Sequence, residues 1–202
     1  MPTATRSGAG WRIAGPAVAI LVAGVVALAV NRGTEDEVPP ADPAPVAVTS
    51  NAPRLATLDE LVAASDLVVR GTVASTEHGR AFGEPGGERI ESRLVTLGVS
   101  EVLAGDPSAE GTLVVEEEGW LEDGAPLVVD GAPPSARGDD GIWFLVEVGD
   151  ADAPVYVVVS AQGRYLVDGD TLRGAAGDDP LIDELTDLSV EELTARIGAL
   201  HR

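Results

Sequence analysis

The sequence has 202 residues, and its 34 acidic against 13 basic side chains give a formal net charge of −21. Charge of this sign repels polyphosphate, which argues against nucleic acid as a partner. Cysteine is absent, so disulfides, thiolate metal sites, a cysteine nucleophile and lipoprotein attachment are excluded. The excess of acid lies wholly after residue 54, where 30 acids face nine arginines, and it indicates a soluble, negatively charged domain.

The N-terminal 30 residues are predicted to contain a membrane segment. Residues 13–30 carry no charge, and a helix of this length is about 27 Å long, close to the thickness of the hydrocarbon core. Arginines before the segment and acids after it predict a cytoplasmic stretch, residues 1–12, and an extracytoplasmic remainder. Three interpretations stay open: a retained transmembrane anchor, a signal peptide cleaved after residues 27–29, and a buried core helix.

Residues 31–54 are rich in proline and have the composition of an extended linker. We expect this segment to be disordered and to act as a stalk, because it offers too few apolar side chains to build a core. At about 3.1 Å per residue, it could hold a domain roughly 70 Å from the bilayer.

The domain predicted over residues 55–202 opens with a helix and three strands. A capping-box spacing at Thr57 starts the helix. The glycine-rich residues 78–88 are expected to form a loop. Alternating apolar residues predict strands at residues 66–75, 93–103 and 112–117. In the second of these strands the alternation slips at Ser100 and Glu101, which predicts a β-bulge that bends the strand toward barrel closure.

Four more strands and two helices complete the predicted domain. The most apolar strands, residues 141–148 and 154–160, are expected to pair across the loop between them. A hairpin is predicted next, with strands at residues 163–167 and 171–174. The last two helices are expected to begin at the N-caps Asp179, which precedes a proline, and Ser189, which starts a second capping box.

These short strands, the bulge and the closely spaced turns predict a mainly β domain, an OB-like small β-barrel with flanking short helices. Trp143 and Phe144 are successive in one strand, so their side chains must point to opposite faces. We expect one of them in the core and the other either covered by the terminal helices or exposed.

The apolar pattern of residues 64–73 and 95–106, with the later strings at 141–145 and 162–165, resembles that of netrin-like domains. These are the OB-like barrels of tissue inhibitors of metalloproteinases, and similar strings occur in exported bacterial proteins of unassigned role. The resemblance covers most of residues 57–175, and it implies an OB-like barrel fold and a general role in binding proteins. Those inhibitors chelate zinc through an N-terminal cysteine, so no residue of this cysteine-free chain takes over that role.

No catalytic, cofactor-binding or metal-binding residue is predicted. His78 and His201 are isolated, and a metal site needs several convergent ligands. The acidic runs are expected to be solvated turns, with weak cation binding as the alternative. A protein-contact face is the remaining hypothesis, and the residues first chosen for it are Arg70, Thr72, Trp120 and Trp143.

The sequence therefore favours an extracytoplasmic binding or accessory module, tethered by its N-terminal helix or secreted, that acts through protein–protein contacts without catalysis. Its expected partners are the membrane and an unknown extracytoplasmic protein, with no nucleic acid and no cofactor. Two alternatives stay open: an envelope-glycan hydrolase that uses convergent carboxylates, and an acidic structural protein of the envelope that holds cations.

Overall fold

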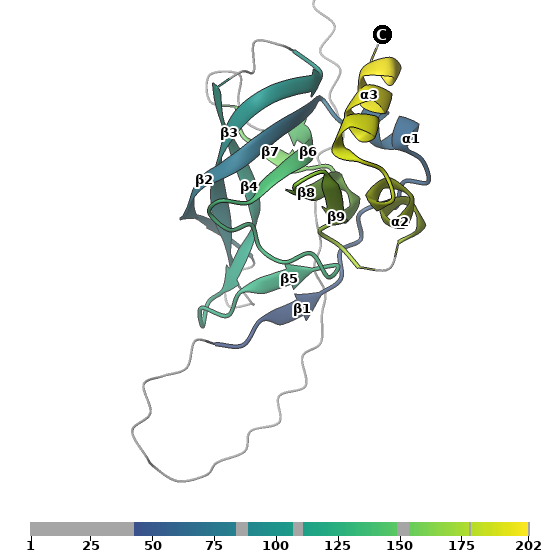
Figure 1. Ribbon diagram of the computed structural model, residues 1–202. Helices are drawn as coiled ribbons and strands as arrows, with labels where there is room; N and C mark the ends of the chain where they lie inside the picture. The colour runs from purple at the N-terminus through teal and green to yellow at the C-terminus, as the bar shows by residue number, and fades with distance from the viewer. Residues whose placement is uncertain (1–42, 84–88, 107–110, 149–153, 178, 202) are drawn as a thin grey trace, which may run out of the picture.

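The computed structural model describes residues 43–83, 89–106, 111–148, 154–177 and 179–201 (Figure 1). The helices are α1 (Leu58–Ala63), the 3-10 turn η2 (Ala161–Gly163), α2 (Pro180–Thr186) and α3 (Val190–Leu200). The strands are β1 (Val46–Val48), β2 (Leu67–Phe82), β3 (Ile90–Ala104), β4 (Gly111–Leu121), β5 (Leu127–Val129), β6 (Asp140–Glu147), β7 (Tyr156–Val158), β8 (Arg164–Asp168) and β9 (Thr171–Gly174).

The predicted membrane segment, residues 13–30, lies outside the described residues. Within the described ranges, the helices are all too short or too polar to span a bilayer.

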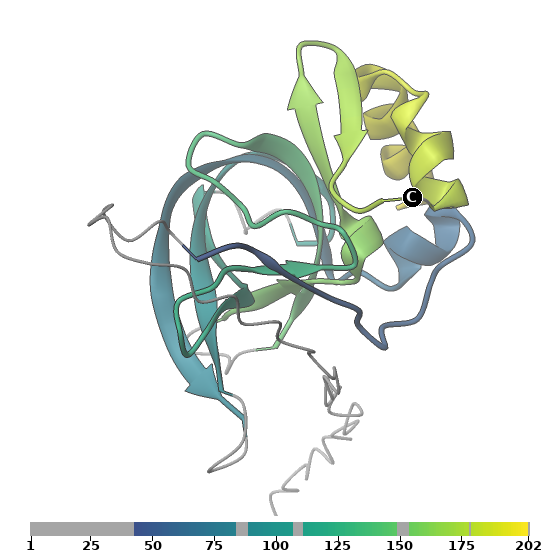
Figure 2. The ribbon, with the colours of Figure 1, turned by 90° about the horizontal axis from the view of Figure 1, so that it is seen from below.

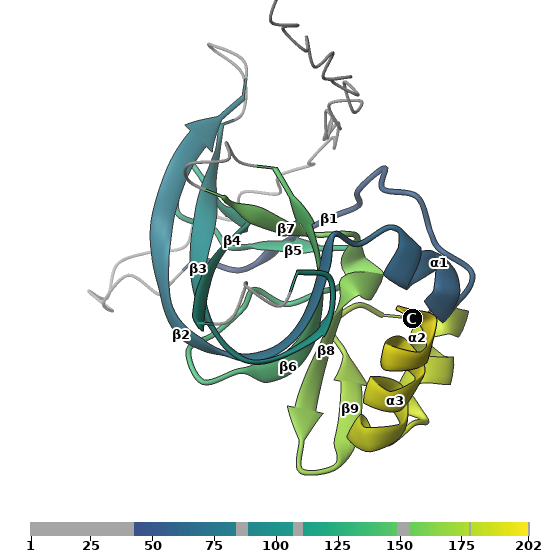
Figure 3. The same ribbon diagram turned by 90° about the horizontal axis from the view of Figure 1, so that it is seen from above.

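Five strands close into a barrel, which confirms the expected mainly β, OB-like fold with flanking short helices. The strands follow the order β2, β3, β4, β7 and β6, and β6 pairs with β2 again. The pair β4–β7 is parallel and the other pairs are antiparallel. Seen from above, β2 curves around the barrel, and the helices gather with β8 and β9 on one side (Figure 3). This strand order is that of an OB fold.

The curvature of the β2–β3 pair depends on bulges in both strands. Gly71 pairs with Val99 and Arg70 with Glu101, so Ser100 is the extra residue of the bulge predicted there. A side chain at Gly71 would lie 2.8 Å from the carbonyl oxygen of Gly98, which explains the glycine at this close approach. The bends let the first half of β2 pair with both β3 and β6.

The β2–β3 hairpin is longer than predicted. Residues 78–82 were expected in a loop because of their glycine and polar content, but they continue β2, and His78 pairs with Arg93. Outside the closed barrel, the ends of β2, β3 and β4 run on together as a sheet, with Phe82 opposite Ile90 and Ile90 opposite Leu121.

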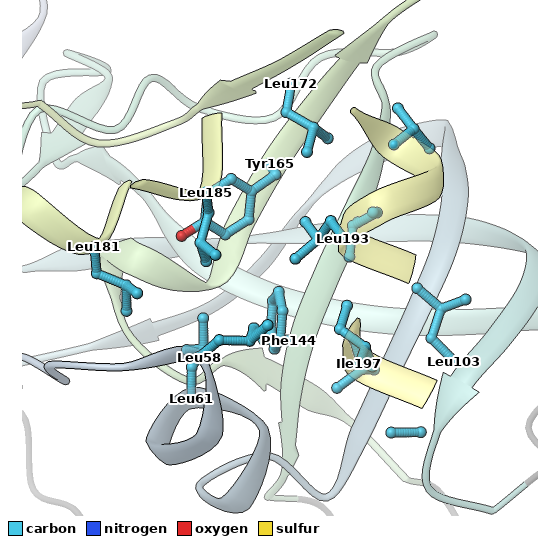
Figure 4. Packing of buried hydrophobic residues seen from close by; sticks show 14 of the residues in the cluster. Leu58, Leu61, Leu103, Phe144, Tyr165, Leu172, Leu181, Leu185, Leu193 and Ile197 are labelled. Atoms are coloured by element: carbon cyan, nitrogen blue, oxygen red, sulfur yellow. The ribbon is translucent and has the colours of Figure 1, made fainter. Parts of the chain in front are cut away.

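Two apolar clusters hold the domain, one on each face of β6. The barrel interior contains Trp143 with aliphatic residues of β2, β3 and β4. Phe144 points the other way, into a cluster with the three helices, where Tyr165 meets it edge-on at 6.0 Å between ring centroids (Figure 4). The predicted opposition of these two aromatics is confirmed, and the helices cover the outer one.

The three helix starts also lie where the sequence predicts them. Thr57, Asp179 and Ser189 are the N-caps of α1, α2 and α3. Ser189 forms a complete capping box, in which its hydroxyl accepts from the Glu192 backbone N–H and the Glu192 carboxylate accepts from the Ser189 N–H. These hydrogen bonds lower the pKa of Glu192.

Ser189→Ala is expected to destabilise the domain by about 1 kcal/mol, because the first turn of α3 loses its cap. Since the pKa of Glu192 is lowered in the folded state, its contribution exists above the ordinary glutamate range and disappears as the pH falls through the lowered pKa. Denaturant unfolding at neutral and at acidic pH measures the loss. Ser189→Asn, which retains a capping side chain, should unfold close to the parent midpoint, and an equal loss in both variants would contradict the capping account.

The expected linker does not extend to residue 54. Residues 43–55, here called the strap, lie on the domain: β1 pairs in parallel with β5, and Ser50 donates from its N–H and hydroxyl to the carboxylate of Asp130. At the end of the strap, Leu55 exchanges two hydrogen bonds with the side chain of Gln162. Backbone and polar-group pairing therefore hold a proline-rich segment that has little apolar surface of its own.

Candidate functional site

The four residues predicted as a contact face do not lie together. Arg70 and Thr72, on the first half of β2, both reach the carboxylate of Asp140, at 3.2 and 3.3 Å. Trp120 lies at the far end of β4 and is partly exposed. The choice of Trp143 was wrong, because this residue is fully buried inside the barrel and has no surface to offer a partner.

A polar cluster, which the sequence did not predict, occupies one end of the barrel interior. Glu117 of β4 and Arg164 of β8 form an ion pair of 3.1 Å, with the Arg164 side chain 5% exposed. Ser135 donates to the Glu117 carboxylate from both its N–H and its hydroxyl. Arg93 donates to the carbonyl oxygen of Ser135 and Arg164 to that of Pro133. The cluster thus binds the loop of residues 130–139 into the barrel end.

The electrostatics of this cluster are unusual for so acidic a chain. Two guanidinium groups are nearly buried here: Arg164 pairs directly with the carboxylate of Glu117, whereas Arg93 is influenced by the Glu117 charge and donates to the Ser135 carbonyl oxygen. Burial lowers the pKa of Arg93, and the nearby charge of Arg164 lowers it further, while Glu117 opposes both effects. A cation–π contact stabilises the charge of Arg164, whose Cζ atom lies 5.5 Å from the Trp143 ring centroid. We call Arg93, Glu117, Ser135 and Arg164 the latch, because their hydrogen bonds hold the loop of residues 130–139 against the barrel.

The extended sheet end carries the second notable group of side chains. We define the sheet end as His78, Phe82, Ile90, Trp120 and Leu121. The rings of His78 and Trp120 are stacked with centroids 4.0 Å apart and planes 12° apart, and the Arg93 Cζ atom lies 4.3 Å from the Trp120 ring centroid. Phe82 is 40% exposed. The stacking immobilises Trp120 while leaving part of it accessible.

An open hollow of about 400 Å³ lies elsewhere, between the barrel, the β8–β9 turn and α3. Its lining carries one guanidinium and three carboxylates, those of Arg70, Glu101, Asp170 and Glu191. In the described part of the chain, no three His, Asp or Glu side chains are grouped so that they could hold a metal ion. The hollow is therefore a charged depression around Arg70, and its described lining does not group ligands for a metal ion.

Glu118, next to the latch, is a carboxylate in an unfavourable place. Burial raises its pKa, and the neighbouring charges of Glu117 and Asp130 raise it further. A raised folded-state pKa means that protonation stabilises the folded form, and that this benefit is lost as the pH rises through the raised pKa. The ionised Glu118 side chain therefore destabilises the folded form at neutral pH.

Glu118→Gln is expected to raise the melting temperature at neutral pH, because the amide has no charge to desolvate or to repel Glu117. At a pH below the ordinary glutamate range the two proteins should melt together, since both side chains are then neutral. Thermal unfolding at the two pH values measures the difference. Glu101→Gln, at an exposed position of β3, serves as the control, and an equal gain there would attribute the effect to net charge alone.

No family model matches the chain, and no curated protein matches it. The assignment of a role therefore depends on the residues of the barrel, the strap and the sheet end.

Proposed function

We propose that this chain is a membrane-tethered extracytoplasmic binding module that acts through protein contacts and has no turnover of its own. The observation that carries the proposal is the sheet end, where Phe82 is 40% exposed on one face of the sheet and Trp120, stacked with His78, is partly exposed on the other. Tryptophan and other aromatic side chains dominate the energetics of protein interfaces.

The fold favours the same part of the surface. OB barrels that bind oligonucleotides or oligosaccharides use the face of the second and third barrel strands, which here are β3 and β4, and we propose that a protein partner uses the same strands. Two residues of the sheet end, Ile90 and Trp120, belong to β3 and β4. The netrin-like pattern of the sequence fits the same role, because such domains bind proteins.

The stacked arrangement of Trp120 also suits recognition. An aromatic ring that is already held between neighbours loses little conformational entropy when a partner covers it. The acid-rich surface around it, including Glu91, which pairs with His78 at 3.0 Å, would restrict binding to partners without a matching negative charge. The uncharged residues 13–30, which are long enough to span a bilayer as a helix, support the tethered form of the proposal over the secreted one.

A variant-resolved pull-down tests the proposal. The full chain, purified with its bound proteins from solubilised envelope, is expected to recover a specific protein that Phe82→Ser loses by about tenfold, the effect of removing a modest aromatic anchor. Leu200→Ser is the matched control, because Leu200 is 42% exposed and lies on α3. Recovery of no specific protein, or equal recovery by both variants, would refute binding through the sheet end.

A further inference from the structure

We infer that the strap turns the sheet end toward the membrane, and that the partner bound there is the outer surface of an integral membrane protein. The inference rests on the proposed function, because it specifies which class of protein the sheet end contacts. We call residues 31–42, between the predicted membrane segment and the strap, the tether. The inference comes from three observations: the docking of the strap, the place where the tether joins the domain, and the charge around the sheet end.

The strap is fastened at both ends. At its start, the Val46 N–H donates to the Pro126 carbonyl oxygen at 2.9 Å, and the Val48 carbonyl accepts from the Asp130 N–H at 2.9 Å. Asp130 is the one non-glycine residue with positive φ, 50°, in the described part of the chain, and its carboxylate binds Ser50. At the other end Arg54 pairs with Asp179 at 3.2 Å. So many specific contacts fix the attachment point of the tether.

The tether leaves the domain on the side of the sheet end. A side chain built at Gly124 would lie 3.9 Å from the Pro43 ring, and Val46 bonds to Pro126, which bridges to Trp120. The end of α3 lies on the opposite side from the start of β1 in both Figure 1 and the view from below in Figure 2. The sheet end is therefore near the tether, and Leu200 is far from it.

Docking of the strap also shortens the tether. An extended residue spans at most about 3.6 Å, so residues 31–42 can reach about 40 Å, whereas residues 31–54 could reach about 80 Å. A compact domain of this size is itself about 40 Å across. With the strap docked, the sheet end can approach the bilayer surface, and the attachment point of the tether stays within about 40 Å of it.

Charge decides between lipid and protein at that position. Next to the sheet end, the four carboxylates of Glu77, Glu91, Glu122 and Asp123 outnumber the exposed guanidinium groups of Arg80 and Arg89. An anionic lipid surface repels such a group of carboxylates. A membrane protein that offers an apolar pocket for Phe82 beside uncharged or basic groups satisfies both the aromatic side chain and the carboxylates.

Single-cysteine labelling of the full chain tests the orientation. Because the sequence has no native cysteine, the fluorophore attaches only at the introduced position. Fluorophores on Phe82→Cys and Leu200→Cys are compared in vesicles of uncharged phosphatidylcholine that contain an acceptor lipid. Energy transfer is expected to be about twofold or more higher from position 82, given a domain about 40 Å across. Equal transfer from the two positions overturns the inference.

Variants of the strap test whether its docking causes this orientation of the domain. Val46→Pro removes the N–H that bonds to Pro126, and Ser50→Ala removes a donor to Asp130. Both changes lie outside the two apolar clusters, so the barrel should still melt cooperatively. The difference between positions 82 and 200 is expected to shrink in each variant, and an undiminished difference overturns the role of the strap.

Photo-crosslinking identifies the partner class. A photoreactive phenylalanine analogue at position 82 of the full chain, in its own envelope, is expected to capture a protein that resists alkaline extraction, while the same analogue at position 200 captures none. Capture of a soluble protein from position 82 overturns the inference but leaves the proposed function standing. Labelling of lipid alone, or of nothing, overturns both.

Discussion

Glu117→Gln is expected to destabilise the domain by about 3–5 kcal/mol, because it removes the carboxylate that neutralises a buried arginine. The Arg164 side chain is 5% exposed and its Nη1 atom lies 3.1 Å from the Glu117 carboxylate. The amide keeps the size of the side chain but leaves Arg164 as a nearly buried cation without its partner carboxylate. Urea unfolding of the purified chain measures the loss.

The neighbouring residue provides a matched control. Glu116 points to the opposite face of β4 and is 11% exposed, but its partner Arg80 is 74% exposed. Water can therefore solvate the guanidinium that Glu116→Gln leaves unpaired, so this change should cost less than about 1 kcal/mol. The double variant Glu117→Met, Arg164→Met removes both charges and should recover most of the stability. Equal losses from the two single substitutions would contradict the view that an unpaired buried charge causes the effect.

The latch could have been partly read from the sequence. Leu113 and Val115 alternate toward the barrel interior, and the same parity places Glu117 inside, between two exposed-looking neighbours. Its partners were out of reach, because Ser135 is 18 positions away and Arg164 is 47. Alternation identifies which face a charged side chain occupies, but only the closed barrel shows which opposite charge it meets there.

Features that depend on neighbouring residues were predictable, and those that depend on distant ones were not. The cap at Ser189 and the bulge at Ser100 need only a few consecutive residues, and the structure contains both. The strap was assigned to a disordered linker because proline and alanine dominate it locally. Its strand exists only because β5 lies alongside, and Ser50 binds a residue 80 positions away.

The candidate site divides in the same way. Trp120 could be chosen as a surface aromatic because it follows an acidic run at the end of a strand, and it is partly exposed. Trp143 was chosen as a second aromatic of the same kind, but its strand β6 has the barrel interior on one face and the helices on the other. A strand buried on both faces reads as a continuous apolar run, so its residues GIWFLV contained the information that Trp143 would be inaccessible.

Trp143→Ala is expected to destabilise the domain by about 3–5 kcal/mol, because it empties the largest side-chain volume in the barrel interior. The Arg164 guanidinium would also lose the ring over which it lies. For a domain whose total stability is about 5–15 kcal/mol, this loss approaches global unfolding. Thermal and urea unfolding followed by circular dichroism measure it.

Trp143→Phe keeps the experiment informative if the alanine variant fails to fold. The indole N–H of Trp143 is buried and has no hydrogen-bond partner among the residues that the structure describes, so its removal forfeits no bond seen there, and a phenyl ring fills most of the space. The expected loss is no more than about 2 kcal/mol, well below that of the alanine variant. A phenylalanine variant as unstable as the alanine one would mean that the indole N–H has a partner, and that the interior of this barrel is stabilised by polar contacts more than by packing.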